Sequence, residues 1–253
     1  MRIVFDIETN GMLYQPWRWS ASWKKDPPPI ADRVHCICLT ESGSGKIERY
    51  HDDPRIPRDG DINDGIARLD RADILIGHNI IRYDIPVLEK LRGRVTPKGQ
   101  TWHDTLVMAH LGYTSLLEKD KRMQPRDLPD ALYGKQSLRA WGYRIGCHKG
   151  HVNDTEDWST FDEDMLRYCA RDVEANDKLY RMFRTSWADK MDEAVRIEHE
   201  FVVALESQMN CGWHIDEDAA WELVRKLTIE KNEMEEELLS LFPPRLVPPQ
   251  FIF

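Results

Sequence analysis

The sequence lacks long apolar runs, although it is not polar overall. Apolar residues make up 41% of the 253 residues and charged residues 31%. No stretch approaches the roughly 18–20 consecutive apolar residues of a membrane-spanning helix. The opening segment, Met1–Asp6, reaches an acidic side chain too early for a secretory signal. The composition therefore predicts a soluble protein with a packed core, no membrane segment and a cytoplasmic location.

Cysteine is scarce, and no two cysteines form a Cys-x-x-Cys pair. An odd number of cysteines in a chain without a leader predicts reduced, mostly buried thiols. Cys147 precedes His148 and lies near His151, but the other ligands of a zinc site are missing, so we interpret this segment as a plain loop. The five cysteines are Cys36, Cys38, Cys147, Cys169 and Cys211.

The chain also lacks an excess of basic residues. Its formal net charge is −9, whereas a nucleic-acid partner usually meets a basic face. A site that holds divalent cations is itself acidic until the cations bind. A protein that contacts only the end of a strand also needs no more than a small basic surface. The net charge therefore neither supports nor excludes a nucleic-acid partner.

Apolar and turn-forming patterns place strands early in the chain and helices afterwards. This order predicts a mixed α/β domain whose sheet forms first, and no internal repeat is present. The long helix that starts near Thr160 is expected to begin at a capping box with Glu163. Residues 11–30 and the stretch around Pro125 and Pro129 are expected to be loops. Strands are predicted at 2–6, 34–40, 46–51 and 73–77, and helices at 62–71, 85–91, 104–111, 137–143 and from 160 past 183.

The last quarter of the chain has a different pattern. Residues 189–241 are charged and helical in period, with a break at Gly212, and the proline-rich 243–249 cannot be helical. We therefore place a domain boundary near residue 188, which gives domains 1–188 and 189–253. The apolar stripe of the first helix is expected to consist of Ile197, Phe201, Ala204, Leu205 and Met209.

Four acidic residues and one tyrosine form the strongest candidate site. Asp6 and Glu8 follow an apolar strand two residues apart, so they share a face. Tyr168 and Asp172 are four apart in a helical pattern and also share a face. Asp84 follows a strand and a loop. Each piece is weak alone, since 44 of 253 residues are acidic, but four converging carboxylates can hold two divalent cations about 3.5–4 Å apart.

Three short patterns follow one another: Asp-x-Glu at 6–8, Asn-x-x-x-Tyr-Asp at 79–84 and Tyr-x-x-x-Asp at 168–172. In this order and at these separations, they resemble the three exonuclease motifs of the DEDD family. The tyrosine resembles that of proofreading exonucleases in family A DNA polymerases. Residues 103–107 and 138–146 are similar to the replicative polymerases of short-tailed coliphages. The resemblance covers about residues 1–187 and implies an RNase H-like fold with a central mixed sheet and a C-terminal helical appendage.

The resemblance implies a two-metal 3′→5′ exodeoxyribonuclease. Asp6 would bridge two Mg²⁺ or Mn²⁺ ions, and Glu8 and Asp172 would complete the site of the nucleophile-side ion. Asp84 would hold the second ion, and Tyr168 would orient the attacking water. The substrate would be a single-stranded or frayed DNA 3′ end, and the products nucleoside 5′-monophosphates.

The appendage resembles the segment that opens the polymerase region of family A enzymes, notably at 197–200 and 215–216. The chain ends at Phe253, so a fragment, a split subunit and a stand-alone exonuclease all fit. The implied partner is a DNA polymerase subunit or the remainder of the same polymerase. A separate polymerase subunit would dock on residues 196–241. A phage-encoded chain would work in the cytoplasm of its bacterial host.

Further residues are candidates for DNA contact, each with a structural alternative. Asn79 could equally form a hydrogen bond to the substrate or cap a turn. Met12 and Leu13 could equally wedge against the terminal base or pack in the core. Asp104 is a helix cap or a support for the site. The aromatic-basic loop Trp17–Trp23 would stack on bases, dock a partner or pack on its own domain. The candidate nucleic-acid contacts are Thr9, Asn10, Met12, Leu13, Asn79, Arg139, Arg144 and Lys149.

Two other functions remain open from the sequence. One is an RNA-trimming 3′→5′ exoribonuclease with the same site, because the metal ligands do not read the 2′-hydroxyl. The other is a non-catalytic domain that docks on a polymerase. The presence of all four carboxylates disfavours the second.

Overall fold

The computed structural model describes residues 1–13, 29–125, 127–147 and 158–242, apart from the side chains of residues 188 and 189. It divides into two compact units, Met1–Glu206 and Ser207–Phe253. Among the described residues, no helix is both long and apolar enough to span a membrane. The loop Trp17–Trp23 and the candidate contact Lys149 lie outside the described residues, as do His148 and His151.

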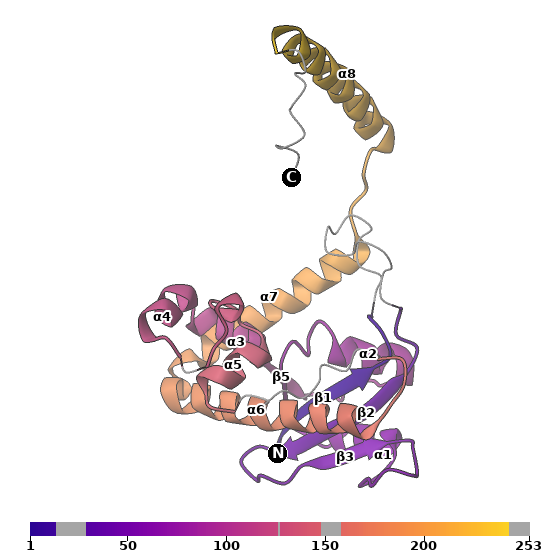
Figure 1. Cartoon of the computed structure of the whole chain (residues 1–253). Helices are drawn as coiled ribbons and strands as arrows, with labels where there is room; N and C mark the ends of the chain where they lie inside the picture. The colour runs from indigo at the N-terminus through magenta and orange to yellow at the C-terminus, as the bar shows by residue number, and fades with distance from the viewer. Residues whose placement is uncertain (14–28, 126, 148–157, 243–253) are drawn as a thin grey trace, which may run out of the picture. The chain divides into compact units, whose positions relative to one another are not determined.

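A five-stranded mixed sheet forms the centre of the first unit (Figure 1). Its strands are β1 (Arg2–Thr9), β2 (Val34–Glu41), β3 (Glu48–His51), β4 (Ile74–Gly77) and β5 (Thr101–Asp104). They lie in the order β3-β2-β1-β4-β5. The β1–β2 and β2–β3 pairs are antiparallel, whereas β1–β4 and β4–β5 are parallel. The strands predicted at 34–40 and 46–51 are confirmed as β2 and β3, which pair as an antiparallel hairpin.

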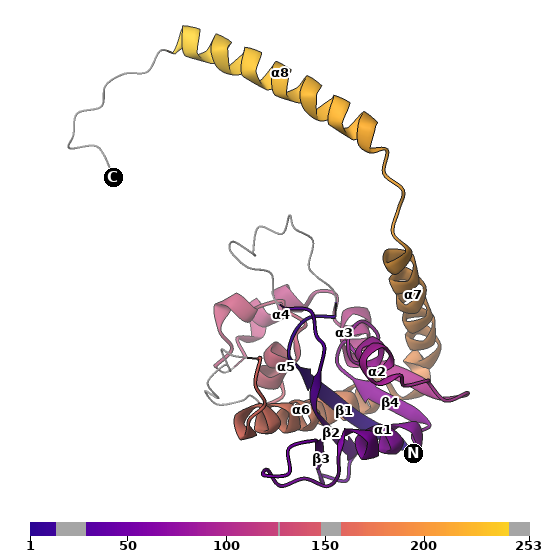
Figure 2. The same cartoon turned by 90° about the vertical axis from the view of Figure 1, so that its right-hand side faces the viewer.

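Helices cover both faces of this sheet, as Figures 1 and 2 show. Ile3, Phe5 and Ile7 of β1 point to one face, where they pack with residues of α1 and α2. Val4 points to the other face, which residues of α3, α5 and α6 cover. Burying apolar side chains on both faces fixes the register of β1, since a one-residue slip would exchange them. The helices are α1 (Ile62–Asp70), α2 (Asp84–Arg92), α3 (Thr105–Gly112), α4 (Leu116–Met123), α5 (Leu138–Arg144) and α6 (Glu163–Trp187), with a short 3-10 turn η1 (Asp130–Leu132).

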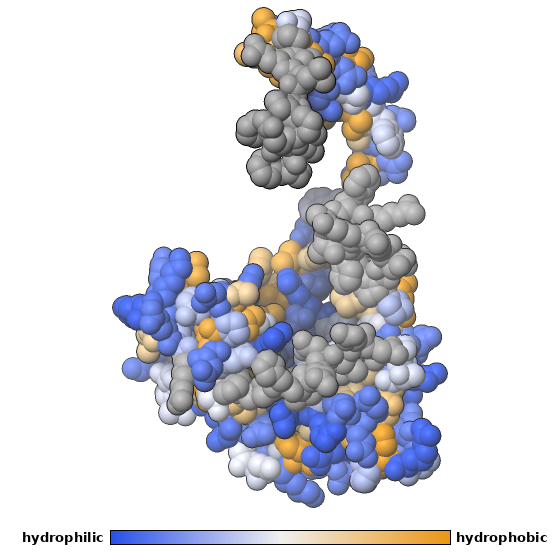
Figure 3. Space-filling model, in the orientation of Figure 1, coloured by the Kyte–Doolittle hydropathy of each residue, from blue (hydrophilic) through white to orange (hydrophobic). Residues whose placement is uncertain are grey.

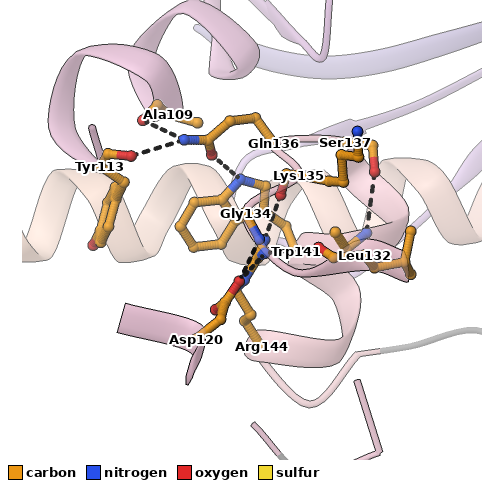
Figure 4. Close-up of polar contacts among 11 residues, drawn as sticks. Ala109, Tyr113, Asp120, Leu132, Gly134, Lys135, Gln136, Ser137, Trp141 and Arg144 are labelled. Atoms are coloured by element: carbon orange, nitrogen blue, oxygen red, sulfur yellow. Dashed lines mark hydrogen bonds and ion pairs between the residues drawn. The ribbon is translucent and has the colours of Figure 1, made fainter. Parts of the chain in front are cut away.

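Two elements were missed by the sequence analysis. Thr101–Asp104 forms strand β5 although its four residues show no alternation, because pairing with β4 decides its conformation. Leu116–Met123 forms helix α4 in a stretch that was expected to be a charged loop. Figure 4 shows how α4 is anchored: Asp120 receives two hydrogen bonds from Arg144 of α5, at 3.0 and 2.7 Å.

The start of α6 also differs from the prediction. The helix begins at Glu163, and the carboxylate of Asp162 accepts a hydrogen bond of 2.8 Å from the backbone of Met165. The predicted capping box at Thr160 is therefore wrong in position. Aspartate three residues before the bonded N–H performs the same capping role.

Helix α7 (Asp192–Cys211) follows a 3-10 turn η2 (Ala188–Met191) and starts within the first unit. Val195 and His199 are buried there, and Arg82 forms a 2.7 Å ion pair with Glu206. The compact units therefore divide after residue 206, because the early turns of α7 pack on the first unit. The division into functional domains 1–188 and 189–253 stays a prediction.

The apolar stripe expected on α7 is largely exposed. Ile197 and Phe201 are 51% and 59% exposed, because the buried positions are those of Val195 and His199. The predicted break at Gly212 is confirmed, since its φ of +68° ends the helix. Helix α8 (Glu217–Leu241) exposes apolar beside hydrophilic side chains (Figure 3).

Candidate active site

The first motif lies on the central strand. Asp6 and Glu8 point to the face of β1 that α6 covers, as the alternation predicts. Asp6 is half-buried, and Glu8 is only 9% exposed. In the antiparallel pairing, Asp6 lies opposite Cys38, and Glu8 lies opposite Cys36.

The third motif comes from α6. The thiol of Cys169 donates to the carbonyl oxygen of Asp6 at 3.4 Å, which places this turn of α6 over the first motif. Farther along, the hydroxyl of Thr105 donates to the side-chain oxygen of buried Asn176 at 2.6 Å, so α6 is also held to the end of β5. The ring of Tyr168 meets that of Trp158 edge-on, with centroids 5.8 Å apart. These contacts fix the helix face that carries Tyr168 and Asp172.

The second motif contributes a carboxyl that is almost fully buried. Asp84 is the first residue of α2, is 3% exposed, and accepts a 3.3 Å hydrogen bond from the backbone of Ile7. Burial first, and then the carboxylates of Asp104 and Asp172, raise the pKa of Asp84 to about 7, although the hydrogen bond from Ile7 acts in the opposite direction. Asp84 is therefore within electrostatic reach of Asp172, the acid contributed by α6.

Asp104 supports the second motif from the adjacent strand. Its carboxylate accepts hydrogen bonds from the backbones of Asn79 (2.8 Å), Ile81 (3.2 Å) and Leu106 (2.9 Å). The last bond caps α3, so the predicted helix cap is confirmed. The first two hold the turn between β4 and α2, in which Asn79 has a φ of +71°. Asp104 is thus both a cap and a positioning residue for the loop that leads to Asp84.

A further contact joins this support to α7. The backbone N–H of Asp104 donates to Nε2 of buried His199 at 2.6 Å, and Nδ1 of His199 lies 2.7 Å from the carbonyl oxygen of Val195. The imidazole is therefore the neutral tautomer with its proton on Nδ1. Burial lowers the pKa of His199, in keeping with this neutral form. This role of His199 could not be predicted from the sequence, because no local pattern links residues 95 positions apart.

Tyr83 is a second residue that the site analysis did not select. Its hydroxyl donates to the carbonyl oxygen of Gly11 at 2.7 Å and also contacts the hydroxyl of Thr9. These bonds fasten the residue before Asp84 to the end of β1. Burial raises the pKa of Tyr83, which keeps the hydroxyl protonated, and the charges of nearby acids, Asp84 first, add to the rise. The position of Tyr83 next to Asp84 was the available signal.

The structure thus gathers the predicted acids from three elements around one end of the sheet. The carboxylates of Asp6 and Glu8 and the thiol of Cys169 have ligand atoms within 4.8 Å of one another. Asp84 is tied to β1 through its hydrogen bond from Ile7, which lies between Asp6 and Glu8, and Asp172 is within electrostatic reach of Asp84. Neither Asp84 nor Asp172 belongs to that 4.8 Å group. We refer to Asp6, Glu8, Asp84 and Asp172 as the four-carboxylate set.

The candidate DNA contacts fall into different structural settings. Thr9 is buried. The side-chain amide nitrogen of Asn10 donates a hydrogen bond of 2.7 Å to the carboxylate of Asp32. Leu13 is 4% exposed and belongs to the core, so packing accounts for it, whereas Met12 is 40% exposed. Arg139 is exposed. As contacts with DNA, these residues stay predictions.

Arg144 was considered as a phosphate contact, but its side chain has another role. The side chain of Arg144 is 7% exposed and is paired with the side chain of Asp120, which is 2% exposed. It also donates to the carbonyl oxygens of Lys135 and Leu132 (Figure 4). A buried arginine with this many protein partners is a structural tie between α4 and α5.

Comparison with known proteins finds sequence relatives among phage enzymes. The chain is 26% identical over 284 residues to the DNA-directed DNA polymerase of Enterobacteria phage T3. It is 27% identical over 282 residues to that of Escherichia phage T7. Each alignment covers 95% of this chain but 37% of the polymerase, so the chain spans just over a third of the length of these relatives. No family model matches the chain.

Comparison with solved structures finds the fold of Brucella melitensis NrnC. The TM-score is 0.54 at 16% sequence identity, over 84% of this chain and 86% of NrnC. With the mixed sheet and the helices on both its faces, this likeness establishes the RNase H-like fold that the motifs implied. The resemblance to phage DNA polymerases that the motifs indicated is confirmed by the two sequence relatives.

Proposed function

We propose that this chain is a 3′→5′ exonuclease that removes nucleotides one at a time from the 3′ end of DNA. The observation that carries the proposal is the four-carboxylate set, gathered from β1, α2 and α6 around one end of the sheet. Burial first, and then the charges of Asp104 and Asp172, raise the pKa of Asp84. A cation bound beside this carboxyl would favour its ionised form.

The donor atoms of the site fit divalent cations. Apart from Cys169, which adjoins Asp6 and Glu8, the ligands are carboxylate oxygens, and oxygen ligands favour Mg²⁺ or Mn²⁺. Asp6, Glu8, Asp84 and Asp172 would hold such ions. Once bound, the cations would stabilise developing charge on the phosphate and lower the pKa of the attacking water.

The protein residues orient the reactants. The hydroxyl of Tyr168 positions the attacking water, and the edge-on ring of Trp158 restrains the tyrosine. Asp104 holds the loop that leads to Asp84 through its bonds to two backbone N–H groups. Because this loop is fixed, the carboxylate of Asp84 stays in position when the substrate arrives, as catalysis requires.

The assignment of DNA as the substrate rests on the likeness to phage DNA polymerases. In this role the exonuclease would proofread for a polymerase, either the remainder of a longer chain or a separate subunit. The 3′ end would be single-stranded or frayed. Met12, which is exposed and lies three positions beyond the buried end of β1, is the candidate that we propose meets a terminal base.

The experiment is a comparison of variants on single-stranded DNA with Mg²⁺. Asp6→Ala and Asp172→Ala should abolish release of nucleoside 5′-monophosphates, because each removes a cation ligand. Asp130→Asn, which changes an exposed acid of η1, is the matched control and should retain full activity. Near-normal activity in either alanine variant, with the fold intact by circular dichroism, would sink the assignment.

A further inference from the structure

Three buried thiols lie together directly beside the four-carboxylate set. Cys36 and Cys38 are two residues apart on β2, so both face α6, and Cys169 of α6 meets them there. All three are free thiols with no exposed surface. Their sulfur atoms lie within 4.8 Å of one another. The proposed nuclease chemistry uses none of the three.

The arrangement matches the geometry of a thiolate metal site. A zinc ion binds thiolates at about 2.3 Å, which places the sulfurs of a trigonal or tetrahedral site about 3.8–4.0 Å apart. The three sulfurs therefore need to move by less than about 1 Å to surround one ion. Three thiolates select soft ions such as Zn²⁺ over Mg²⁺.

A fourth ligand is also at hand. Cys169 belongs to a second group, in which its sulfur and the carboxylate oxygens of Asp6 and Glu8 lie within 4.8 Å of one another. An ion bound to Cys169 would thus have a carboxylate within reach to complete a four-coordinate shell.

We propose that Cys36, Cys38 and Cys169 form a binding site for one thiophilic divalent ion, with Zn²⁺ as the physiological ligand. Binding forms three metal–sulfur bonds and breaks three S–H bonds, whose protons pass to solvent. The bound ion draws Asp6 or Glu8 toward the thiolates and so inhibits the nuclease. This last consequence rests on the proposed function, whereas binding itself does not.

Cadmium is the probe, because thiolate-to-cadmium charge transfer absorbs in the ultraviolet and oxygen ligands give no such band. The reduced, chelator-free chain is titrated with Cd²⁺ while absorbance and proton release are followed. We expect the band to saturate at one ion per chain. Cys38→Ala should lower the affinity for Cd²⁺ at least about 100-fold. Loss of a residue that only hydrogen-bonds a metal ligand already costs about 10–100-fold in affinity, and Cys38 would be a ligand itself. Cys211→Ala, which changes an exposed thiol of α7, should leave the titration unchanged.

Several outcomes would overturn the proposal. One is a wild-type chain without a saturable band, and another is a Cys38→Ala chain with an undiminished one. Cys169→Ala provides a second variant, since alanine is the best helix former and preserves α6. The same samples are then assayed on DNA with excess Mg²⁺: one equivalent of Cd²⁺ should stop the wild type and spare Cys38→Ala. Binding without inhibition refutes only the consequence, and a chain inactive without Cd²⁺ refutes the proposed function while the titration still decides the site.

Discussion

Asp84 should destabilise the fold when no cation is bound. Its pKa rises from an ordinary 3.8 to about 7, chiefly through burial. At about 1.4 kcal/mol for each pKa unit, ionising this carboxyl in the folded chain costs up to about 4 kcal/mol. Because the folded pKa is raised, the contribution of Asp84 to stability is fully present below its unfolded value and is lost as the pH rises through about 7.

Replacing Asp84 with asparagine removes this cost while keeping the oxygen that accepts from Ile7. In EDTA at pH 8, we expect Asp84→Asn to raise the free energy of unfolding by about 1–4 kcal/mol and Tm by about 2–16 °C. At pH 4 the two proteins should unfold within a few degrees of each other. Thermal denaturation followed by circular dichroism at both pH values measures the difference.

Two comparisons make the test specific. Asp130→Asn changes the net charge equally but alters an exposed side chain, so its Tm should follow the wild type at both pH values. Adding Mg²⁺ at pH 8 should stabilise the wild type more than Asp84→Asn, because the cation offsets the buried charge. If Asp84→Asn is less stable than the wild type at pH 8 in EDTA, the reasoning from burial is wrong.

Substitutions at three further residues test other parts of the proposed structure–function relationship. Tyr168→Phe should lower kcat by less than the 10²–10⁴-fold expected for loss of a general base, and a loss as deep as that of a cation ligand would contradict its orienting role. Asp104→Ala leaves three backbone N–H groups without their acceptor and should cost at least about 3 kcal/mol in urea unfolding, whereas Asp104→Asn should cost less. Arg144→Met leaves the buried Asp120 carboxylate without its cationic partner, so it should destabilise the fold by about 3–5 kcal/mol. Activity per folded molecule should not change, and a reduced value would show that Arg144 serves the substrate.

The sequence revealed the acids of the site but not what holds them. Asp6 with Glu8, and Tyr168 with Asp172, share faces because strand and helix periods require it, so their grouping was predictable. The bonds from Asp104 to the second motif depend on β5, which pairing with β4 creates and no local pattern signals. The burial that raises the pKa of Asp84 is likewise a property of the assembled core.

The grouping of the three thiols could also be predicted only in part from the sequence. Cys36 and Cys38 could be assigned to one strand face from the sequence. Their meeting with Cys169, more than 130 residues later, depends on how α6 crosses the sheet. Helix α7 is similar, because its charged sequence did not indicate that His199 would be buried against the backbone of Asp104.

The central claim is tested most directly by the products that the purified chain makes from DNA. A 3′-overhang DNA labelled at its 5′ end is incubated with Mg²⁺ or with EDTA, beside an RNA of the same sequence. We predict a ladder on the DNA that shortens by one nucleotide at a time, is absent in EDTA, and is weaker on the RNA. Equal or faster trimming of the RNA would contradict the assignment of DNA as the substrate, and no cleavage of either strand would contradict the exonuclease itself.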